Sequence, residues 1–302
     1  MAVISKLRYL RRVAVQRLSN RDRCCPNCGG QRSALVSTKY VVTQLRRCED
    51  CLLMYRDPPD PPGFGELFYN EKYRAGFTTD LPGERELQKF MQTQFRGTPK
   101  DYSRYVSILL ALGIRPGMKL LDYGCSWGYG TWQLQQIGFE CWGFDISASR
   151  TRYATDNLGV RIVENLQEFR AHPQNLGAFD CFFAAHVLEH VAAATQVIEL
   201  AGALLKRGGL LVAFMPNGSA ECRRTCTTWD KWWGEAHPNL IDDAFLEHAL
   251  GDVPKLVAAT PIDLSALESV ALRRRETVRF DLSGSELMVV ARKLGVGRRW
   301  IK

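Results

Sequence analysis

A glycine-rich stretch that follows a short apolar run constrains the fold of this chain more than any other feature. It covers residues 119–130: the apolar part ends in Asp122, a helical pattern begins at Thr131, and glycines stand at positions 124, 128 and 130. This order predicts a strand, a tight turn and the start of a helix. Glycine lets a backbone pass close to a ligand, and the first turn of a helix presents unpaired N–H groups to it. The turn is therefore the first candidate for a binding site.

A second apolar run supports this interpretation. It covers residues 139–145 and ends in Asp145, about 20 residues after the turn, where an acid at a strand end can bind ribose hydroxyls. The alternative is that Asp145 only caps the next helix, together with Ser147.

Three more segments complete the outline of an α/β fold. Residues 179–185 and 206–217 are apolar enough for buried strands, a helical pattern lies between them, and residues 285–291 read as the final strand. Strands that alternate with helices indicate a parallel sheet with helices on both faces. The pattern does not place a sixth strand, which is expected between residues 255 and 281.

Four segments resemble, in the same order, the motifs of class I S-adenosylmethionine-dependent methyltransferases. They are residues 121–125, 143–147, 186–190 and 205–209. The resemblance covers roughly residues 103–293 and implies a Rossmann-like, seven-stranded methyltransferase sheet with helices on both faces. Ser126 stands where the family usually has glycine, but serine is small, so donor binding is expected to survive. A nicotinamide cofactor is the alternative ligand, although the third glycine of a phosphate clamp is missing.

The resemblance also implies which residues hold the methyl donor, S-adenosylmethionine. They lie on the turn and at the ends of the neighbouring strands: Asp122, Gly124, Cys125, Ser126, Gly128, Asp145, Ile146, Asn165, Leu166 and His186. Asp145 is expected to bind the ribose hydroxyls of the donor.

Two Cys-x-x-Cys pairs near the N-terminus have the spacing of a zinc site. Nineteen residues separate Cys25 and Cys28 from Cys48 and Cys51. Four thiolates give closed tetrahedral coordination, so the predicted Zn²⁺ is structural. A disulfide or a redox pair is the alternative, but ten cysteines in 302 residues are not the density of a secreted disulfide protein. Cys24 is a neighbour that could compete as a ligand.

A zinc ribbon ahead of such a domain is similar to the bacterial sugar methyltransferases of deoxysugar and cell-surface polysaccharide pathways. This wider resemblance covers residues 23–293 and implies methyl transfer to a sugar-containing acceptor, either a nucleotide sugar or a glycan, in the cytoplasm. One alternative is an RNA methyltransferase that uses the ribbon to bind its substrate. Another is a non-catalytic scaffold with a relic fold.

Candidate catalytic residues follow the strand at 179–185. His186, Glu189 and His190 share one helical face if a helix begins there. A neutral histidine can take the proton of a sugar hydroxyl or of an activated sugar carbon, so His190 with Glu189 is the predicted base. His237 is the alternative base, on an insert whose tryptophans either face the sugar or pack in the core. The histidines after the strand could instead only pack against the donor. The spacing of His186, Glu189 and His190 also matches an inverted zinc-protease pattern, but no third ligand is apparent.

The positive charge of the chain is concentrated at its N-terminus. Residues 1–23 hold seven Lys and Arg against one Asp, which is +6 of the net +8, so the remainder is not a basic nucleic-acid binder. Residues 1–22 read as a basic amphipathic helix that contacts the inner membrane face, a partner protein or its own domain. A cleaved organelle presequence is a further reading. No apolar run reaches the ~18 residues of a membrane span.

The predicted organisation has five parts. The amphipathic helix at 1–22 precedes the zinc ribbon at 23–57, a linker and helical cap at 58–102, the methyltransferase domain at 103–293 and a basic tail at 294–302. The linker begins in a stretch with four prolines, which stiffens the backbone.

Overall fold

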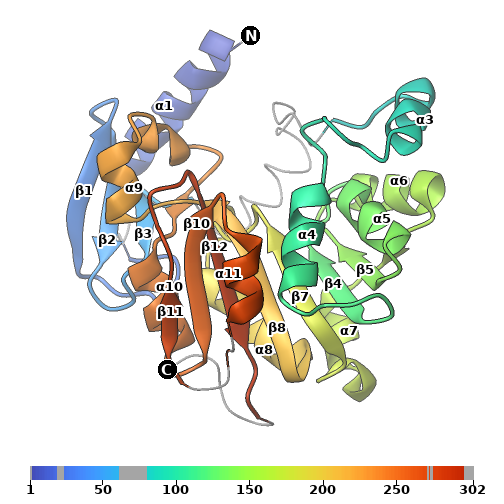
Figure 1. Ribbon diagram of the computed structural model, residues 1–302. Helices are drawn as coiled ribbons and strands as arrows, with labels where there is room; N and C mark the ends of the chain where they lie inside the picture. The colour runs from blue at the N-terminus through green and yellow to red at the C-terminus, as the bar shows by residue number, and fades with distance from the viewer. Residues whose placement is uncertain (1, 19–23, 61–79, 271, 273–274, 296–302) are drawn as a thin grey trace.

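The computed structural model describes residues 2–18, 24–60, 80–270, 272 and 275–295. These residues form an eight-stranded sheet covered by helices and a separate four-stranded sheet near the N-terminus (Figure 1). Most of the predicted linker and the first part of the predicted cap, as well as the end of the basic tail, lie outside the described residues.

The large sheet confirms the expected α/β fold. Its order is β11-β10-β12-β8-β7-β4-β5-β6, and the strands from β8 to β6 are parallel. β12 runs antiparallel to both of its neighbours. The bounds are β4 Lys119–Tyr123, β5 Glu140–Phe144, β6 Arg161–Ile162, β7 Phe179–Ala185, β8 Leu205–Pro216, β10 Lys255–Thr260, β11 Thr277–Arg279 and β12 Glu286–Arg292.

The sheet contains the strand that the sequence pattern did not place and one further strand that was not predicted. The missing sixth strand is β10, which lies between β11 and β12. An eighth strand, β11, pairs in parallel with β10 at the edge and was not predicted. Three residues are too short a run to show the alternation by which a strand is recognised.

Helices cover both faces of the sheet, as predicted. On one face lie α4 (Ser103–Ala111), α5 (Tyr129–Gln136), α6 (Ala148–Leu158) and α11 (Leu264–Ser269). On the other face lie α7 (Leu166–Ala171), α8 (Ala194–Leu204) and α10 (Asp243–Leu250). Along β8, Leu211 and Ala213 enter one core while Leu210 and Val212 enter the other. A strand buried on both faces in this way reads as one continuous apolar run.

The small sheet takes strands from two distant parts of the chain. It has the order β1 (Ser33–Lys39), β2 (Thr43–Cys48), β3 (Met54–Asp57) and β9 (Asn239–Leu240). The first three strands form the predicted ribbon, whereas β9 belongs to the segment after β8. The ribbon is therefore joined to the rest of the molecule by strand pairing.

The aromatic insert lies between β8 and β9 and contains α9 (Ala220–Thr225) and a 3-10 turn, Trp229–Trp232. Trp229 and Trp233 are each only 2% exposed and pack against Leu45 of the ribbon. The idea that these tryptophans face a sugar is therefore wrong for both side chains, because they form the apolar core between insert and ribbon.

The N-terminal helix α1 (Ala2–Leu18) docks on its own chain. Tyr9 and Val13 are buried, and Arg12 forms ion pairs with Asp60 and with Glu235 of the insert. No helix among the residues that the structure describes is long and apolar enough to cross a membrane.

The described part of the predicted cap contains α3 (Glu84–Gln92) and packs on the glycine-rich turn. Phe95, just after this helix, stacks against Phe90 and contacts the rings of Trp127 and Tyr129. This segment lies beside α5 and α6, on the opposite side of the molecule from the ribbon (Figure 1).

Candidate active site

The glycine-rich turn between β4 and α5 has the backbone geometry that its glycines predict. Gly124, Ser126 and Gly128 all have positive φ angles, of 85°, 53° and 82°. A Cβ atom at Gly124 would overlap the side chain of Val187, the residue after His186. Only glycine avoids both the strain and the overlap at that position. The turn after β4 therefore touches the turn after β7.

Asp145 lies at the end of β5 with its carboxylate fixed beside the turn. One oxygen accepts a hydrogen bond from the amide of Ser126 and the other from the amide of Ser147, each at 2.9 Å. Burial raises the pKa of Asp145, and these hydrogen bonds partly oppose the rise. A carboxylate oxygen has a second lone pair, so both oxygens retain capacity for ligand hydroxyls.

Ser126 offers a further polar atom at the same place. Its hydroxyl oxygen is buried and has no hydrogen-bond partner among the described residues. A buried polar atom without a partner is costly unless a ligand or water satisfies it. Together with Asp145 and the exposed Ile146, this atom fits the ribose end of an adenosyl ligand.

Asp122 and Cys125 are also at the turn, but their side chains face the protein interior. Asp122 is buried and accepts a hydrogen bond from the hydroxyl of Thr131 at 2.7 Å, which ties the end of β4 to α5. Burial raises the pKa of Asp122 to about 7. These two residues shape the turn, so their contribution to a ligand would come from the backbone.

Asn165 and Leu166 stand at the start of α7, after the neighbouring strand β6. The side-chain oxygen of Asn165 accepts hydrogen bonds from the amides of Gln167 and Glu168, which makes Asn165 the N-cap of this helix. Leu166 is half-buried. The sequence assigned both residues to the donor, and the structure adds a capping role for the first.

The segment after β7 is a turn, so the prediction that His186, Glu189 and His190 share a helical face is wrong. The next helix, α8, begins only at Ala194. The amide of His186 donates to the carbonyl of Phe214 on β8 at 2.8 Å, and His186 has a φ of 57°. The amide of His186 thus supplies a hydrogen bond just past the last paired residue, Ala185, and the left-handed backbone of His186 then turns the chain.

The turn nevertheless brings the three side chains together. Oε1 of Glu189 lies 3.2 Å from Nδ1 of His186 and 3.8 Å from Nε2 of His190. The other ring nitrogen of His186, Nε2, lies 2.9 Å from Oε1 of Glu286. Each carboxylate therefore has the imidazole of His186 as a neighbour.

The surroundings of His186, Glu189 and His190 shift the pKa values of these side chains in different directions. Burial lowers the pKa of His186, but hydrogen bonds to Glu189 and Glu286 outweigh it and raise the pKa to about 10. Burial raises the pKa of Glu189, but the hydrogen bond with His186 and the neighbouring histidines lower it to about 2. Burial lowers the pKa of His190 to about 4. At neutral pH the site therefore holds a charged His186, a charged Glu189 and a neutral His190.

His237 of the insert completes this cluster. Its ring centroid lies 4.7 Å from that of His190, and one ligand atom from each of Glu189, His190 and His237 lies within 4.8 Å of the others. The sequence placed His237 among the candidates but could not bring it to the same site. That contact depends on the path of the insert.

Several residues at this site were missed by the sequence reasoning. Glu286, at the start of β12, accepts hydrogen bonds from the hydroxyls of Tyr105 and Thr260, and it pairs with Arg104 at 2.8 Å. The only signal was an acid at the head of an otherwise apolar strand, residues 286–291. These side chains fix His186 from the side opposite Glu189.

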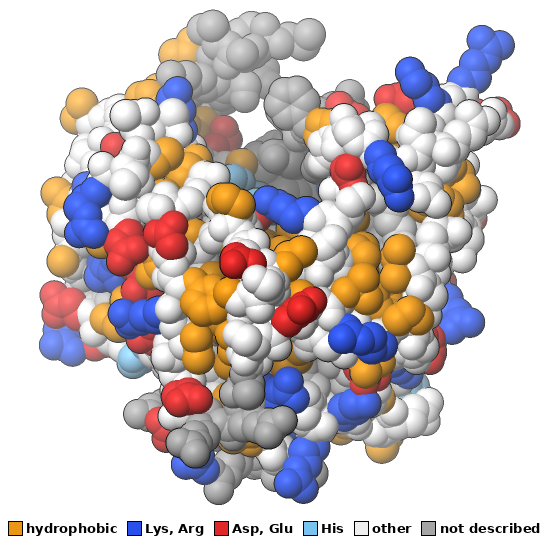
Figure 2. All heavy atoms as spheres, viewed as in Figure 1, with side chains coloured by type: hydrophobic (Ala, Val, Ile, Leu, Met, Phe, Trp, Pro, Cys, Tyr) orange, Lys and Arg blue, Asp and Glu red, His pale blue; other side chains and the backbone are white. Residues whose placement is uncertain are grey.

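The surface is hollowed near this edge of the molecule. Figure 2 shows the hollow between the side that carries the ribbon and insert and the side that carries α3 and α4, with histidine atoms visible at its edge. The turns after parallel strands meet at one edge of a sheet, where open α/β folds bind ligands.

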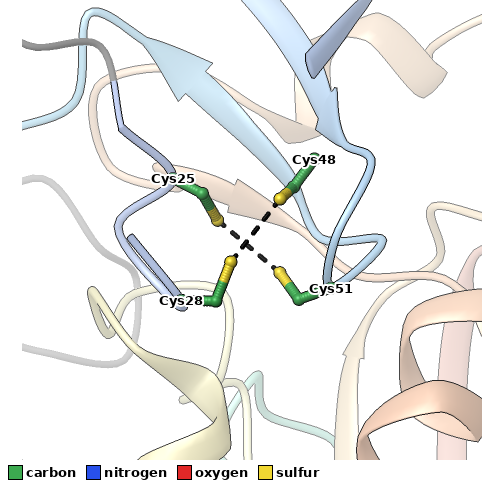
Figure 3. A group of neighbouring side chains, drawn as sticks. All are labelled: Cys25, Cys28, Cys48 and Cys51. Atoms are coloured by element: carbon green, nitrogen blue, oxygen red, sulfur yellow. Dashed lines mark hydrogen bonds between the residues drawn. The ribbon is translucent and has the colours of Figure 1, made fainter. Parts of the chain in front are cut away.

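The four cysteines of the ribbon converge on one centre (Figure 3). The Sγ atoms of Cys25 and Cys51 lie 3.6 Å apart, as do those of Cys28 and Cys48. A tetrahedral site with Zn–S bonds of about 2.3 Å needs sulfur atoms about 3.8 Å apart. The donor set and its spacing therefore fit the predicted structural Zn²⁺.

Comparison of the sequence with known proteins finds a methyltransferase domain. The sequence model of the methyltransferase-domain family matches residues 91–253, which is more than half of the chain. A ubiquinone biosynthesis O-methyltransferase of Methylocella silvestris is 29% identical over 132 residues, covering 42% of this chain and 49% of the relative. An uncharacterised 37.1 kDa protein in transposon Tn4556 of Streptomyces fradiae is 34% identical over 120 residues, covering 37% and 34%.

The chain therefore spans about half the length, or less, of the curated relatives that it matches. Among solved structures, geranyl diphosphate C-methyltransferase from Streptomyces coelicolor has a TM-score of 0.46 and 14% identity. That similarity covers 78% of this chain and 100% of the other.

Proposed function

Because the chain belongs to the methyltransferase-domain family, we propose that it transfers a methyl group from S-adenosylmethionine to a sugar-containing acceptor. The donor lies over the turn at residues 124–128, with its ribose hydroxyls on Asp145. The fixed carboxylate of Asp145 supports this position, as does the buried hydroxyl of Ser126, which has no hydrogen-bond partner within the described part of the chain. The assignment to the donor of His186, Asn165 and Leu166 remains part of the proposal.

One observation supports the proposed binding position of the acceptor. Val187 touches the glycine-rich turn, and the same loop continues into Glu189 and His190. A donor bound over the turn would thus lie next to a cluster of polar groups. An acceptor hydroxyl held there is near the methyl carbon, and positioning supplies much of the rate of such a transfer.

Methyl transfer from a sulfonium needs few catalytic groups. The acceptor oxygen attacks the methyl carbon, the sulfonium bond breaks and S-adenosylhomocysteine leaves. The hydroxyl proton must pass to a base, and His190 is our choice because its Nε2 faces the Glu189 carboxylate. His237 is the alternative, and the charged His186 is unsuited to accept a proton.

A sugar-containing acceptor, such as a nucleotide sugar or a cell-surface glycan, is favoured by the resemblance to sugar methyltransferases. An RNA acceptor bound by the ribbon is disfavoured by two observations. The ribbon packs against Trp229 and Trp233 and pairs with β9, so part of its surface is already covered. Most of the net positive charge also lies in the first 23 residues.

The test is methyl transfer from a labelled donor to a panel of nucleotide sugars and glycans, with RNA as comparator. His190→Ala should lower turnover by roughly 10²–10⁴-fold, because a positioned base contributes about that much. Donor binding, measured by calorimetry, should stay near wild type. His237→Ala separates the two candidate bases, and His172→Ala is the matched control because His172 is exposed on another segment.

Two results would contradict the proposal. Transfer to RNA but to none of the sugars would move the acceptor to the alternative class. Full activity on the true acceptor in both His190→Ala and His237→Ala would remove these histidines from the chemistry.

We also propose that the protein is cytoplasmic and that its N-terminal helix makes a peripheral contact with the inner membrane face. Leu7, Val15 and Leu18 of α1 remain exposed although the helix docks on its own chain. Exposed apolar side chains beside arginines suit an anionic lipid surface.

A further inference from the structure

We propose that Glu189, His190 and His237 form a binding site for one divalent transition-metal ion, distinct from the four-cysteine site. One ligand atom from each residue lies within 4.8 Å of the others, a grouping that could hold one metal ion. Two imidazoles and one carboxylate are a ligand set that suits ions such as Zn²⁺, Co²⁺ or Fe²⁺. Two of these residues, Glu189 and His190, belong to the segment that matches a zinc-protease pattern, but the third ligand comes from the insert, which the sequence does not place beside them.

The hydrogen bonds behind the ligands prepare both histidines for an ion. Nδ1 of His190 lies 2.7 Å from the carbonyl oxygen of Ala236, and Nδ1 of His237 lies 2.8 Å from that of Trp232. A carbonyl oxygen only accepts, so both Nδ1 atoms carry the proton and both Nε2 atoms hold a lone pair. Backbone carbonyls commonly fix metal-binding histidines in this way.

The carboxylate provides an independent observation. Oε2 of Glu189 is buried and has no hydrogen-bond partner among the described residues, and the whole side chain is only 1% exposed. The charged His186 contacts the other oxygen, Oε1. A buried carboxylate is stable only when it is paired, hydrogen-bonded or bound to a metal. An ion bound by this carboxylate and the two histidines would compensate the buried negative charge.

Three protein ligands would leave a coordination position open, which is the arrangement of catalytic rather than structural metal sites. A hydroxyl bound at that position would release its proton to solvent water more readily, because the ion would stabilise the oxyanion. In this last respect the inference rests on the proposed function. As ligands, both histidines would act on the acceptor through the ion instead of taking its proton themselves.

The test measures ion binding alone, in the absence of donor and acceptor. The full chain is prepared with its ribbon filled by zinc, as checked by elemental analysis, and is then titrated with Co²⁺ by calorimetry and absorption spectroscopy. Wild type and His172→Ala should bind about one further equivalent, with visible bands typical of nitrogen and oxygen ligands. His237→Ala and Glu189→Gln should each weaken binding by roughly tenfold or more.

Circular dichroism and binding of S-adenosylhomocysteine confirm that each variant is folded. Absence of a further Co²⁺ equivalent in folded wild type would overturn the inference. So would unchanged affinity in both His237→Ala and Glu189→Gln, or thiolate-to-cobalt bands with release of zinc, which would place the ion in the ribbon. These outcomes concern ion binding alone. Methyl transfer to a sugar is tested separately, by the assay with labelled donor.

Discussion

At the scale of single residues, the site is defined by carboxylates whose surroundings give them different tasks. Asp122 is buried and braces the turn through Thr131. Asp145 is held by two amides at the end of β5 and keeps lone pairs for a ligand. Glu189 is charged and lies between histidines. Similar acids thus differ in burial, hydrogen bonds and charge, according to what lies around them, and the roles proposed for Asp145 and Glu189 rest on these differences.

Asp145→Ala should weaken donor binding without unfolding the protein. A hydrogen bond to a charged group contributes about 1.5–3 kcal/mol, so affinity for S-adenosylmethionine should fall by roughly tenfold or more. Calorimetry measures this directly. Asp145→Asn, which keeps one acceptor oxygen, should fall between wild type and Asp145→Ala. An alanine variant that is folded and binds the donor as wild type does would rule out the ribose contact.

At the scale of elements, the ribbon holds the insert that carries His237. Met54 and Tyr55 of β3 pair with Leu240 and Asn239 of β9, and the amide of Arg56 donates to the carbonyl of Pro238 at 2.7 Å. These contacts begin one residue after His237. The position of that histidine therefore depends on the order of the ribbon, which the proposed zinc ion would stabilise.

Cys48→Ser should disturb the active site from a distance. It should remove about one equivalent of zinc, lower the melting temperature and reduce turnover more than donor affinity, because a structural metal contributes directly to folding. We also expect a loosened ribbon and lower solubility. Elemental analysis, thermal melting and the methyl-transfer assay measure these effects. Cys24→Ser is the matched control, since Cys24 lies beside the site but is not one of the four converging cysteines. A purified, fully active protein without zinc would contradict the structural role.

At the scale of the whole molecule, positive charge and exposed apolar side chains gather at the N-terminal side. Leu18 of α1 and Val41 of the β1–β2 turn are each 85% exposed. Arg17 links the two segments, because its guanidinium donates to the carbonyl of Val42 at 3.1 Å. The helix and the tip of the ribbon thus form one surface, although they are separate in the sequence.

This surface should bind anionic membranes. The double variant Leu18→Asp, Val41→Asp should sediment with phosphatidylglycerol-containing vesicles roughly tenfold less well than wild type, because it loses apolar contact and gains repulsion. Raised salt should weaken wild-type binding. Leu176→Asp, at an exposed position elsewhere, is the matched control. Equal binding to pure phosphatidylcholine vesicles, or no effect of the double variant, would argue against a lipid contact.

The sequence alone determined the parts of this protein that depend on local patterns. Apolar runs ending in Asp122 and Asp145 predicted β4 and β5, and glycines predicted the tight turn between β4 and α5. Cysteine spacing predicted the convergence of the four thiols. Each of these signals lies within a short stretch, or in a repeated motif whose geometry is known, so no long-range information was needed.

Only the tertiary structure decided which distant segments meet. It placed the sixth strand beside β12, turned the expected helix at His186 into a loop by pairing that residue with Phe214, and made a core of the insert tryptophans. It also brought His237 to Glu189 and His190, through the pairing of β3 with β9. Periodicity records whether a residue is buried and how its neighbours alternate, but it does not record the partner. The partners of these residues follow from how whole elements pack, and the candidate active site lies where those elements meet.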